Sequence, residues 1–113
     1  MGNNKTYKPI LIDTLKASTD LKKQRFAGFD GNYCEAGKKA FGIVDADTSA
    51  EELAPIALNG ILLIECGGTI SAFDEITSDS EGRAIVCSSQ DTSNGFALDS
   101  GEEGDTIRIV RGI

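Results

Sequence analysis

The sequence predicts an all-β protein, a small single-domain barrel or sandwich of short strands with at most one short helix and a flexible N-terminal arm. Thirteen glycines are spread along 113 residues, the apolar runs are short, and no long amphipathic helical period is present. A chain of this length can bury one hydrophobic core without disulfides or metals. We therefore divide the sequence into an arm, residues 1–15, and a β domain, residues 16–113.

The most apolar run of the chain is Ile-Leu-Leu-Ile at residues 61–64. Asn59-Gly60 precedes this run and Gly67-Gly68 follows it, so it is too short for a stable helix. We expect a buried strand between two turns here. Residues 69–70 and 84–87 are expected to form the next strands outward.

The N-terminal segment combines a polar tip with an apolar stretch. Residues 2–6 are rich in glycine and asparagine, which does not support order on its own. Residues 9–15 are apolar enough to form a strand, and Pro9 at its start suits an edge position, where one ladder donor is missing. Two interpretations stay open: this strand pairs with the sheet edge of another chain, or with the edge of its own sheet.

Short strands separated by turn residues continue after the arm. Residues 26–29 carry two phenylalanines ahead of an Asp30-Gly31 turn, and residues 32–34 would be the returning strand. Residues 40–44 are expected to form a further strand. Residues 49–53 are the only candidate for a helical turn, with Ser49 as its cap.

A weak internal repeat relates residues 42–58 to residues 95–110. Each unit has a strand, an acidic loop and a second strand, so we interpret the repeat as two hairpin-like units. In the last strand, Ile107 and Ile109 share one face and Arg108 lies on the other, which is typical of a strand with one solvated side.

The net charge of −7 is unevenly distributed along the chain. Six basic residues against two acidic ones give residues 1–25 a charge of +4, which leaves −11 on the remaining residues. Phosphate binding needs clustered positive charge, so an acidic body argues against direct binding of nucleic acid. No stretch is apolar enough for a signal peptide or a membrane span, so we expect synthesis in the cytoplasm and no membrane partner.

The residues that could carry chemistry are few. The three cysteines, Cys34, Cys66 and Cys87, form no metal-binding spacing, and the chain has no histidine. We expect Cys66 and Cys87 to be small core residues. Two acidic clusters, Asp45 with Asp47 and the group around Glu102, Glu103 and Asp105, lack the regular spacing of a calcium loop and are expected to be solvated. The sequence predicts no catalytic residues, no cofactor and no metal, and therefore no enzyme.

Taken in order, seven segments resemble the capsid cement, or head decoration, proteins of tailed bacteriophages. The resemblance spans about residues 10–112. The segments are KASTDL (16–21), RFAGFDG (25–31), AFGIV (40–44), LNG (58–60), GGTI (67–70), TSDSEGRA (77–84) and GDTIRIV (104–110).

The resemblance implies a structural role on a virus particle. Such proteins bind the outer surface of the expanded head, commonly as homotrimers, and stabilise contacts between major capsid proteins. In related decoration proteins an N-terminal arm adds a strand to capsid protein, which assigns capsid binding here to Lys8, Pro9, Ile10, Leu11 and Ile12. The alternative is a soluble β module that binds calcium or a glycan. The absence of tryptophan and the presence of only two tyrosines argue against a glycan site.

Overall fold

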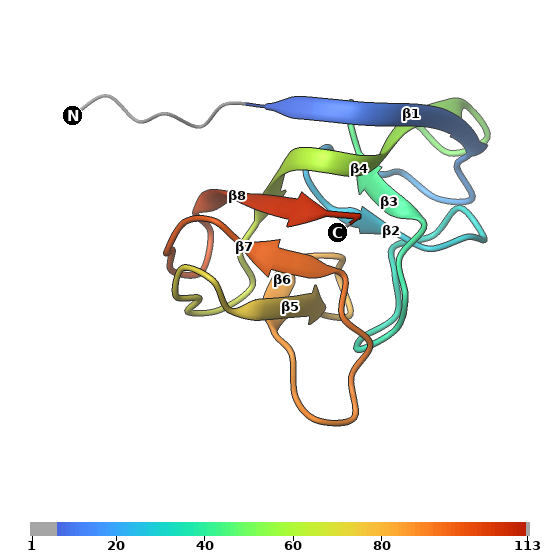
Figure 1. Ribbon diagram of the computed structural model, residues 1–113. Helices are drawn as coiled ribbons and strands as arrows, with labels where there is room; N and C mark the ends of the chain where they lie inside the picture. The colour runs from blue at the N-terminus through green and yellow to red at the C-terminus, as the bar shows by residue number, and fades with distance from the viewer. Residues whose placement is uncertain (1–6, 113) are drawn as a thin grey trace.

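The computed structural model describes residues 7–112, in which one antiparallel sheet curls into a nearly closed barrel (Figure 1). This part of the chain has eight strands and no helix, so the all-β prediction is confirmed. The strands are β1 (Lys8–Lys16), β2 (Phe26–Ala27), β3 (Gly42–Val44), β4 (Leu53–Glu65), β5 (Glu75–Ser78), β6 (Ala84–Val86), β7 (Gly95–Ala97) and β8 (Thr106–Arg111). Their order in the sheet is β2-β3-β4-β8-β7-β5-β6, with β1 also paired to β4.

Strand β4 is the longest, with 13 residues, and both of its edges are paired. One edge pairs with β1 along residues 53–61. The opposite edge pairs first with β3, at residues 56–57, and then with β8, at residues 60–65. The predicted buried strand at residues 61–64 is therefore the second half of a longer strand that connects both parts of the sheet.

The two repeat units correspond to the β3–β4 pair and the β7–β8 pair, which lie on either side of the β4–β8 pairing. Strand β3 pairs with the first half of β4, β7 pairs with the end of β8, and β4 pairs with β8 between them. The ends of the sheet approach each other because the Phe26 amide donates to the Gly82 carbonyl at 2.6 Å and the Gly67 amide donates to the Ala84 carbonyl at 2.7 Å. The first bond joins β2 to the turn just before β6, and the second joins the segment that follows β4 to β6. Strand β6 therefore lies close to both β2 and the end of β4, which gives the sheet its barrel shape.

The buried side chains form two clusters, and β4 contributes to both. Ile56 belongs to the smaller cluster, whereas Ala57, Leu62 and Ile64 belong to the larger one. The register explains the change of side: Ile12 pairs with Ala57 while the preceding residue of β1 pairs with residue 59, so β4 carries an extra residue at this point. Such a bulge shifts the alternation by one, which lets an odd-numbered residue share a face with later even-numbered ones.

Gly60 follows the bulge and has a backbone conformation that favours glycine, with φ at +113°. A Cβ atom at this position would lie 2.8 Å from the Ile10 amide nitrogen and 3.0 Å from Pro9 Cα. Glycine therefore allows β1 to approach β4 closely at the point where β4 bends.

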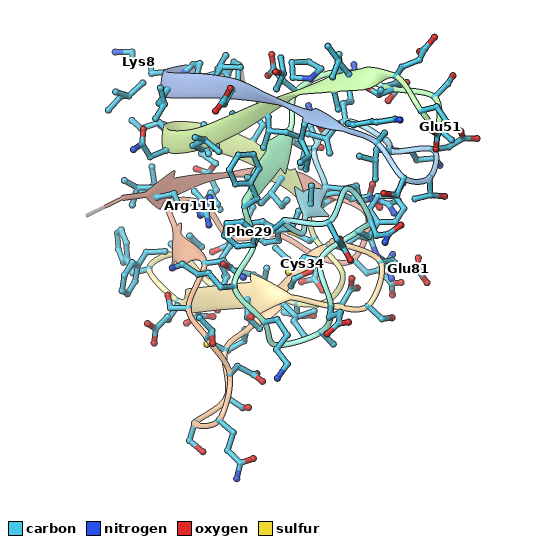
Figure 2. All side chains as sticks on the ribbon, turned by 90° about the vertical axis from the view of Figure 1, so that its right-hand side faces the viewer. Lys8, Phe29, Cys34, Glu51, Glu81 and Arg111 are labelled. Atoms are coloured by element: carbon cyan, nitrogen blue, oxygen red, sulfur yellow. The ribbon has the colours of Figure 1, made fainter. Side chains whose placement is uncertain are left out.

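Arg111, at the end of β8, stabilises the same bend of β4 from the edge opposite to β1; Figure 2 labels this residue. Its guanidinium donates to the carbonyls of Phe41 and Leu58, each at 2.9 Å, and also to the carbonyl of Ala40. Burial lowers the pKa of Arg111, and its buried Nε has no hydrogen-bond partner among the described residues. One side chain thus joins the loop before β3, the bulge of β4 and the end of β8.

Three local predictions differ from the structure. The predicted helical turn at residues 49–53 is wrong, because residues 50–51 form a turn and Leu53 already begins β4. Glu51 has φ at 75°, which a right-handed helix does not allow, and the Ala50 amide donates to the Asp20 carboxylate at 2.9 Å. Residues 69–70 and 32–34 are also not extended strands. They contribute one isolated bridge each, from Ile70 to Gly101 and from Tyr33 to Ala27.

We predict that Gly60→Ala lowers the free energy of unfolding by about 2–4 kcal/mol and removes hydrogen-exchange protection from the amides of β1. The added Cβ both strains a positive φ and collides with the backbone of β1. Gly104→Ala is the matched control, because Gly104 also has a positive φ but has nothing within 4 Å of the added atom. It should cost only about 1–2 kcal/mol, and equal losses for the two variants would contradict the close approach of β1.

We predict that Arg111→Ala lowers the free energy of unfolding by about 2–4 kcal/mol, because it leaves carbonyl groups without their charged donor in a largely buried place. Urea denaturation measures the change. Lys16→Ala is the control: the ion pair of Lys16 with Glu51, at 3.1 Å, is exposed and should contribute less than about 1 kcal/mol. If the Arg111 variant unfolds at the same urea concentration as the control, these hydrogen bonds do not hold the bend.

Candidate functional site

Strand β1 contains all five residues that the sequence assigned to capsid binding, and it lies along one side of the molecule (Figure 1). Its apolar side chains are largely in solvent: the exposed fractions are 81% for Ile10, 50% for Leu11 and 45% for Ile12. Lys8 is also exposed and Pro9 is half-buried. Three successive exposed aliphatic side chains are unusual on a protein surface, which makes this strand a candidate interaction site.

The exposure follows from how β1 is held. It pairs with β4 alone, and no strand among residues 7–112 pairs with its other edge. The backbone ladder therefore fixes the strand while few of its side chains reach the core. An edge strand with free backbone donors and acceptors is a ready template for pairing with another chain.

The end of β1 is anchored in the smaller core cluster. Leu15 packs against this cluster, and Ala17, just beyond the strand, is fully buried within it. The Ala17 amide donates to the Glu52 carbonyl at 2.9 Å, and the Glu51 amide donates to the Ala17 carbonyl at 2.7 Å. The exposed apolar residues are therefore held on a strand whose far end is fixed.

A side-chain contact holds the start of the strand. The Tyr7 hydroxyl donates to the Asp45 carboxylate, and burial together with this hydrogen bond raises the pKa of Tyr7. Asp45 directly follows β3, which pairs with the edge of β4 opposite to β1. The hydrogen bond of Tyr7 therefore connects the beginning of β1 to the strand on the other edge of β4.

The sequence left two pairings open for residues 9–15, and the structure has the pairing with the chain's own sheet. Residues 8–15, which the sequence placed in an arm outside the β domain, are an edge strand of that domain. The predicted polar tip at residues 2–6 lies outside the described residues.

A second apolar surface was not predicted from the sequence. Ile61 of β4 pairs with Val110 of β8, which in turn pairs with Phe96 of β7. Paired residues on adjacent strands lie on the same face, so these three form a row across the outside of the sheet. Lys8 of β1 and Glu75 of β5 continue the row at its two ends. Only the register reveals this row, because its members come from distant parts of the sequence.

The acidic residues that could have served as metal ligands are used in hydrogen bonds within the protein, two of them with loop amides. The Asp47 carboxylate accepts from the Lys23 amide at 2.8 Å, and the Asp105 carboxylate accepts from the Glu102 amide at 2.9 Å. Within residues 7–112 no group of three or more histidine, cysteine, aspartate or glutamate residues is placed to hold a metal ion. In the same range no helix is long and apolar enough to cross a membrane.

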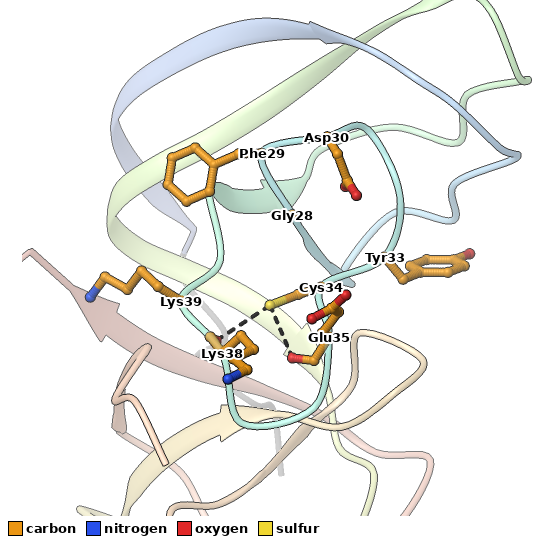
Figure 3. A pocket seen from close by; sticks show the side chains of 8 residues that line it. All are labelled: Gly28, Phe29, Asp30, Tyr33, Cys34, Glu35, Lys38 and Lys39. Atoms are coloured by element: carbon orange, nitrogen blue, oxygen red, sulfur yellow. Dashed lines mark hydrogen bonds between the residues drawn. The ribbon is translucent and has the colours of Figure 1, made fainter. Parts of the chain in front are cut away.

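Cys34 lies in a pocket of about 280 Å³ between the Asp30 turn and the lysines at 38 and 39 (Figure 3). Its Sγ lies 3.4 Å from both the Glu35 carbonyl and the Lys38 carbonyl, so the thiol donates within its own loop. Burial raises the pKa of this thiol. A protonated thiol that donates to a backbone carbonyl is a poor nucleophile. Here the thiol stabilises the conformation of its own loop.

These features define a small β-sheet module that presents an apolar edge strand to its surroundings. The family model for phage cement protein matches residues 5–113, and the chain belongs to this family. It is a capsid decoration protein of the bacteriophage head, as the resemblance implied.

Among solved structures, a similar chain is the head fiber gp8.5 N base in bacteriophage phi29, with a TM-score of 0.76 and 17% sequence identity. The match covers 90% of this chain and 93% of that chain. At this identity the likeness shows a shared fold. Comparison with curated proteins gave no match.

We predict that removal of divalent ions with a chelator leaves the melting temperature of the protein unchanged, because the carboxylates of both acidic clusters accept hydrogen bonds from amides, hydroxyls or a guanidinium of the protein. Thermal unfolding followed by circular dichroism, with and without chelator, measures this. A drop of more than about 5 °C, roughly 1 kcal/mol for a domain of this size, would indicate a bound ion and revive the calcium interpretation.

Proposed function

We propose that this protein binds the outer surface of the expanded phage head through β1 and contacts the major capsid protein there. In this proposal it stabilises contacts between neighbouring capsid proteins, acts as a homotrimer and catalyses no reaction. Binding to nucleic acid or to a membrane is not part of the role. Synthesis in the host cytoplasm also stays part of the proposal.

The observation that carries the proposal is the exposure of Ile10, Leu11 and Ile12 on an edge strand. A strand of the capsid protein could pair with the free edge of β1 and cover Leu11 and Ile12 at the same time. Main-chain hydrogen bonds would supply affinity, and the apolar side chains would supply specificity. Membership of the phage cement protein family makes the head the place where such a partner occurs.

The structure also favours this binding energetically. Because β1 is already an ordered strand, little conformational entropy is lost when a partner strand is added. Burying the exposed halves of Leu11 and Ile12 would contribute about 1 kcal/mol each. Main-chain hydrogen bonds between β1 and the capsid strand would add to this affinity. Because many copies of the protein would bind one head, their contacts together would reinforce the capsid shell.

We propose the absence of catalysis on the same structural grounds. The Cys34 thiol donates to backbone carbonyls, and the chain has no histidine that could act as its base. A protein that holds capsid subunits together needs surface complementarity and no reacting group.

We predict that Leu11→Ser combined with Ile12→Ser weakens attachment to expanded heads by about thirtyfold, which corresponds to about 2 kcal/mol. The lost interaction is the burial of the two side chains against the partner. Binding is measured by sedimentation of purified heads that lack the protein, mixed with increasing concentrations of each variant. Ile10 is left unchanged because it also lines a groove with β4 and β8.

Leu53→Ser is the matched control for this experiment. Leu53 is an exposed aliphatic residue, 68% accessible, at the opposite end of the β1–β4 pairing. It should bind heads as tightly as the unmodified protein. Undiminished decoration by the double variant would move the capsid-binding surface away from β1.

A further inference from the structure

Phe73 is an exposed aromatic side chain on a constrained loop. It lies between the isolated bridge at Ile70 and strand β5, and 77% of its surface is accessible. Its φ is 75°, a left-handed conformation that bulky residues rarely adopt. The loop thus presents a phenyl ring to solvent from a backbone that would suit a smaller residue better.

Hydrogen bonds fix this loop in place. The Phe73 amide donates to the Ala97 carbonyl at 2.7 Å, and the Ala72 amide donates to the Ser100 hydroxyl at 3.0 Å. The Ser71 amide donates to the Asp74 carboxylate at 2.9 Å. An unfavourable conformation persists only where its surroundings determine it, and such positions occur preferentially where a side chain has a task.

The same chain carries an apolar groove that could receive an aromatic side chain. The groove lies between β1, β4 and β8, has a volume of about 340 Å³, and is lined by Ile10, Ile61 and Val110 among others. Lys8 and Arg111 also line it, and Figure 2 shows both on the same side of the molecule. Apolar surface predominates in this groove, which is the chemistry that accepts a phenyl ring.

Charge complements shape between the loop and the groove. Phe73 is followed by Asp74 and Glu75, whereas Lys8, an exposed cation, lines the groove. Phe73 is not one of the residues that line this groove, and Glu75, two residues further on, is separated from the groove residue Val110 by strand β7. The two complementary features therefore point outward from different parts of one sheet.

We propose that Phe73 of one copy inserts into the groove formed by Ile10, Ile61 and Val110 of a second copy. The two surfaces are different, so the contact is head to tail, and repetition of such a contact closes a ring when the rotation allows it. Asp74 and Glu75 of the first copy then face Lys8 of the second. This inference rests on the self-association proposed above and names the residues that form it.

The first test compares the molar mass of variants by size-exclusion chromatography with light scattering. Phe73→Asn keeps a residue that tolerates the left-handed backbone but removes the ring, and should raise the dissociation constant between copies at least tenfold. Phe29→Asn is the control, because Phe29 is also an exposed phenylalanine, 65% accessible, in another loop, where its ring contacts that of Phe41. Circular dichroism verifies that both variants are folded. An oligomer of unchanged mass in Phe73→Asn would overturn the proposal.

The second test traps the contact covalently. In a Cys87→Ser background, Phe73→Cys combined with Val110→Cys should form disulfide-linked oligomers under mild oxidation, both in solution and on decorated heads. Phe73→Cys combined with Leu53→Cys is the control and should not. Absence of cross-linking in both settings, or equal cross-linking of the control, would overturn the proposal.

The two proposals fail in different ways. Cross-linked rings that do not decorate heads would contradict the capsid-binding role and support the contact between copies. If Phe73→Asn weakened decoration while the Phe73–Val110 cysteine pair gave no cross-link on heads, Phe73 would contact capsid protein, and the contact between copies would be overturned.

Discussion

The structure depends on the double pairing of β4, since both edges of this strand are occupied and every other part of the sheet connects through it. The pairing requires β4 to change direction, because its first half faces β3 and its second half faces β8. An extra residue at the bulge and the positive φ of Gly60 permit the bend. The guanidinium of Arg111 then holds the bend by donating to carbonyls from two separate segments. A buried cation bound by neutral carbonyls is costly to place but, once formed, fixes the geometry of its surroundings.

The same arrangement explains why β1 is exposed. The core on both faces of β4 is completed by strands on the opposite edge, so β1 adds backbone hydrogen bonds but little buried area. An exposed, apolar edge strand promotes aggregation when nothing covers it, and proteins usually protect such edges with charges or bulges. Here β1 has a lysine at each end and two register shifts between Pro9 and Ile12. Its aliphatic residues nevertheless remain accessible, which fits a strand whose partner is another protein of the phage head.

The two proposed contacts, attachment to the head and contact between copies, use different features of one sheet. The free edge of β1 offers backbone groups in a line, which suits an extended segment of a partner. The groove beside Ile61 and Val110 offers a concave apolar surface, which suits a single inserted side chain. In these proposals, one copy makes both kinds of contact at once: it binds the phage head and it contacts a second copy. In the two proposals, the free edge of β1 and the groove lie next to each other, whereas Phe73 lies in the loop before β5.

The sequence by itself determined the class of fold, the short strands and the position of the most apolar one, because alternation, glycine pairs and aliphatic runs are local signals. It also indicated the exposed strand, since residues 9–15 combine an edge proline with aliphatic residues behind a polar tip. It could not choose between pairing within the chain and pairing with another chain, because both satisfy the same backbone groups. The left-handed Glu51 and Phe73 were missed because these residue types rarely adopt that conformation. Only the tertiary structure decided the row from Ile61 to Phe96, the groove and the buried role of Arg111, because register and burial arise when distant segments are brought together.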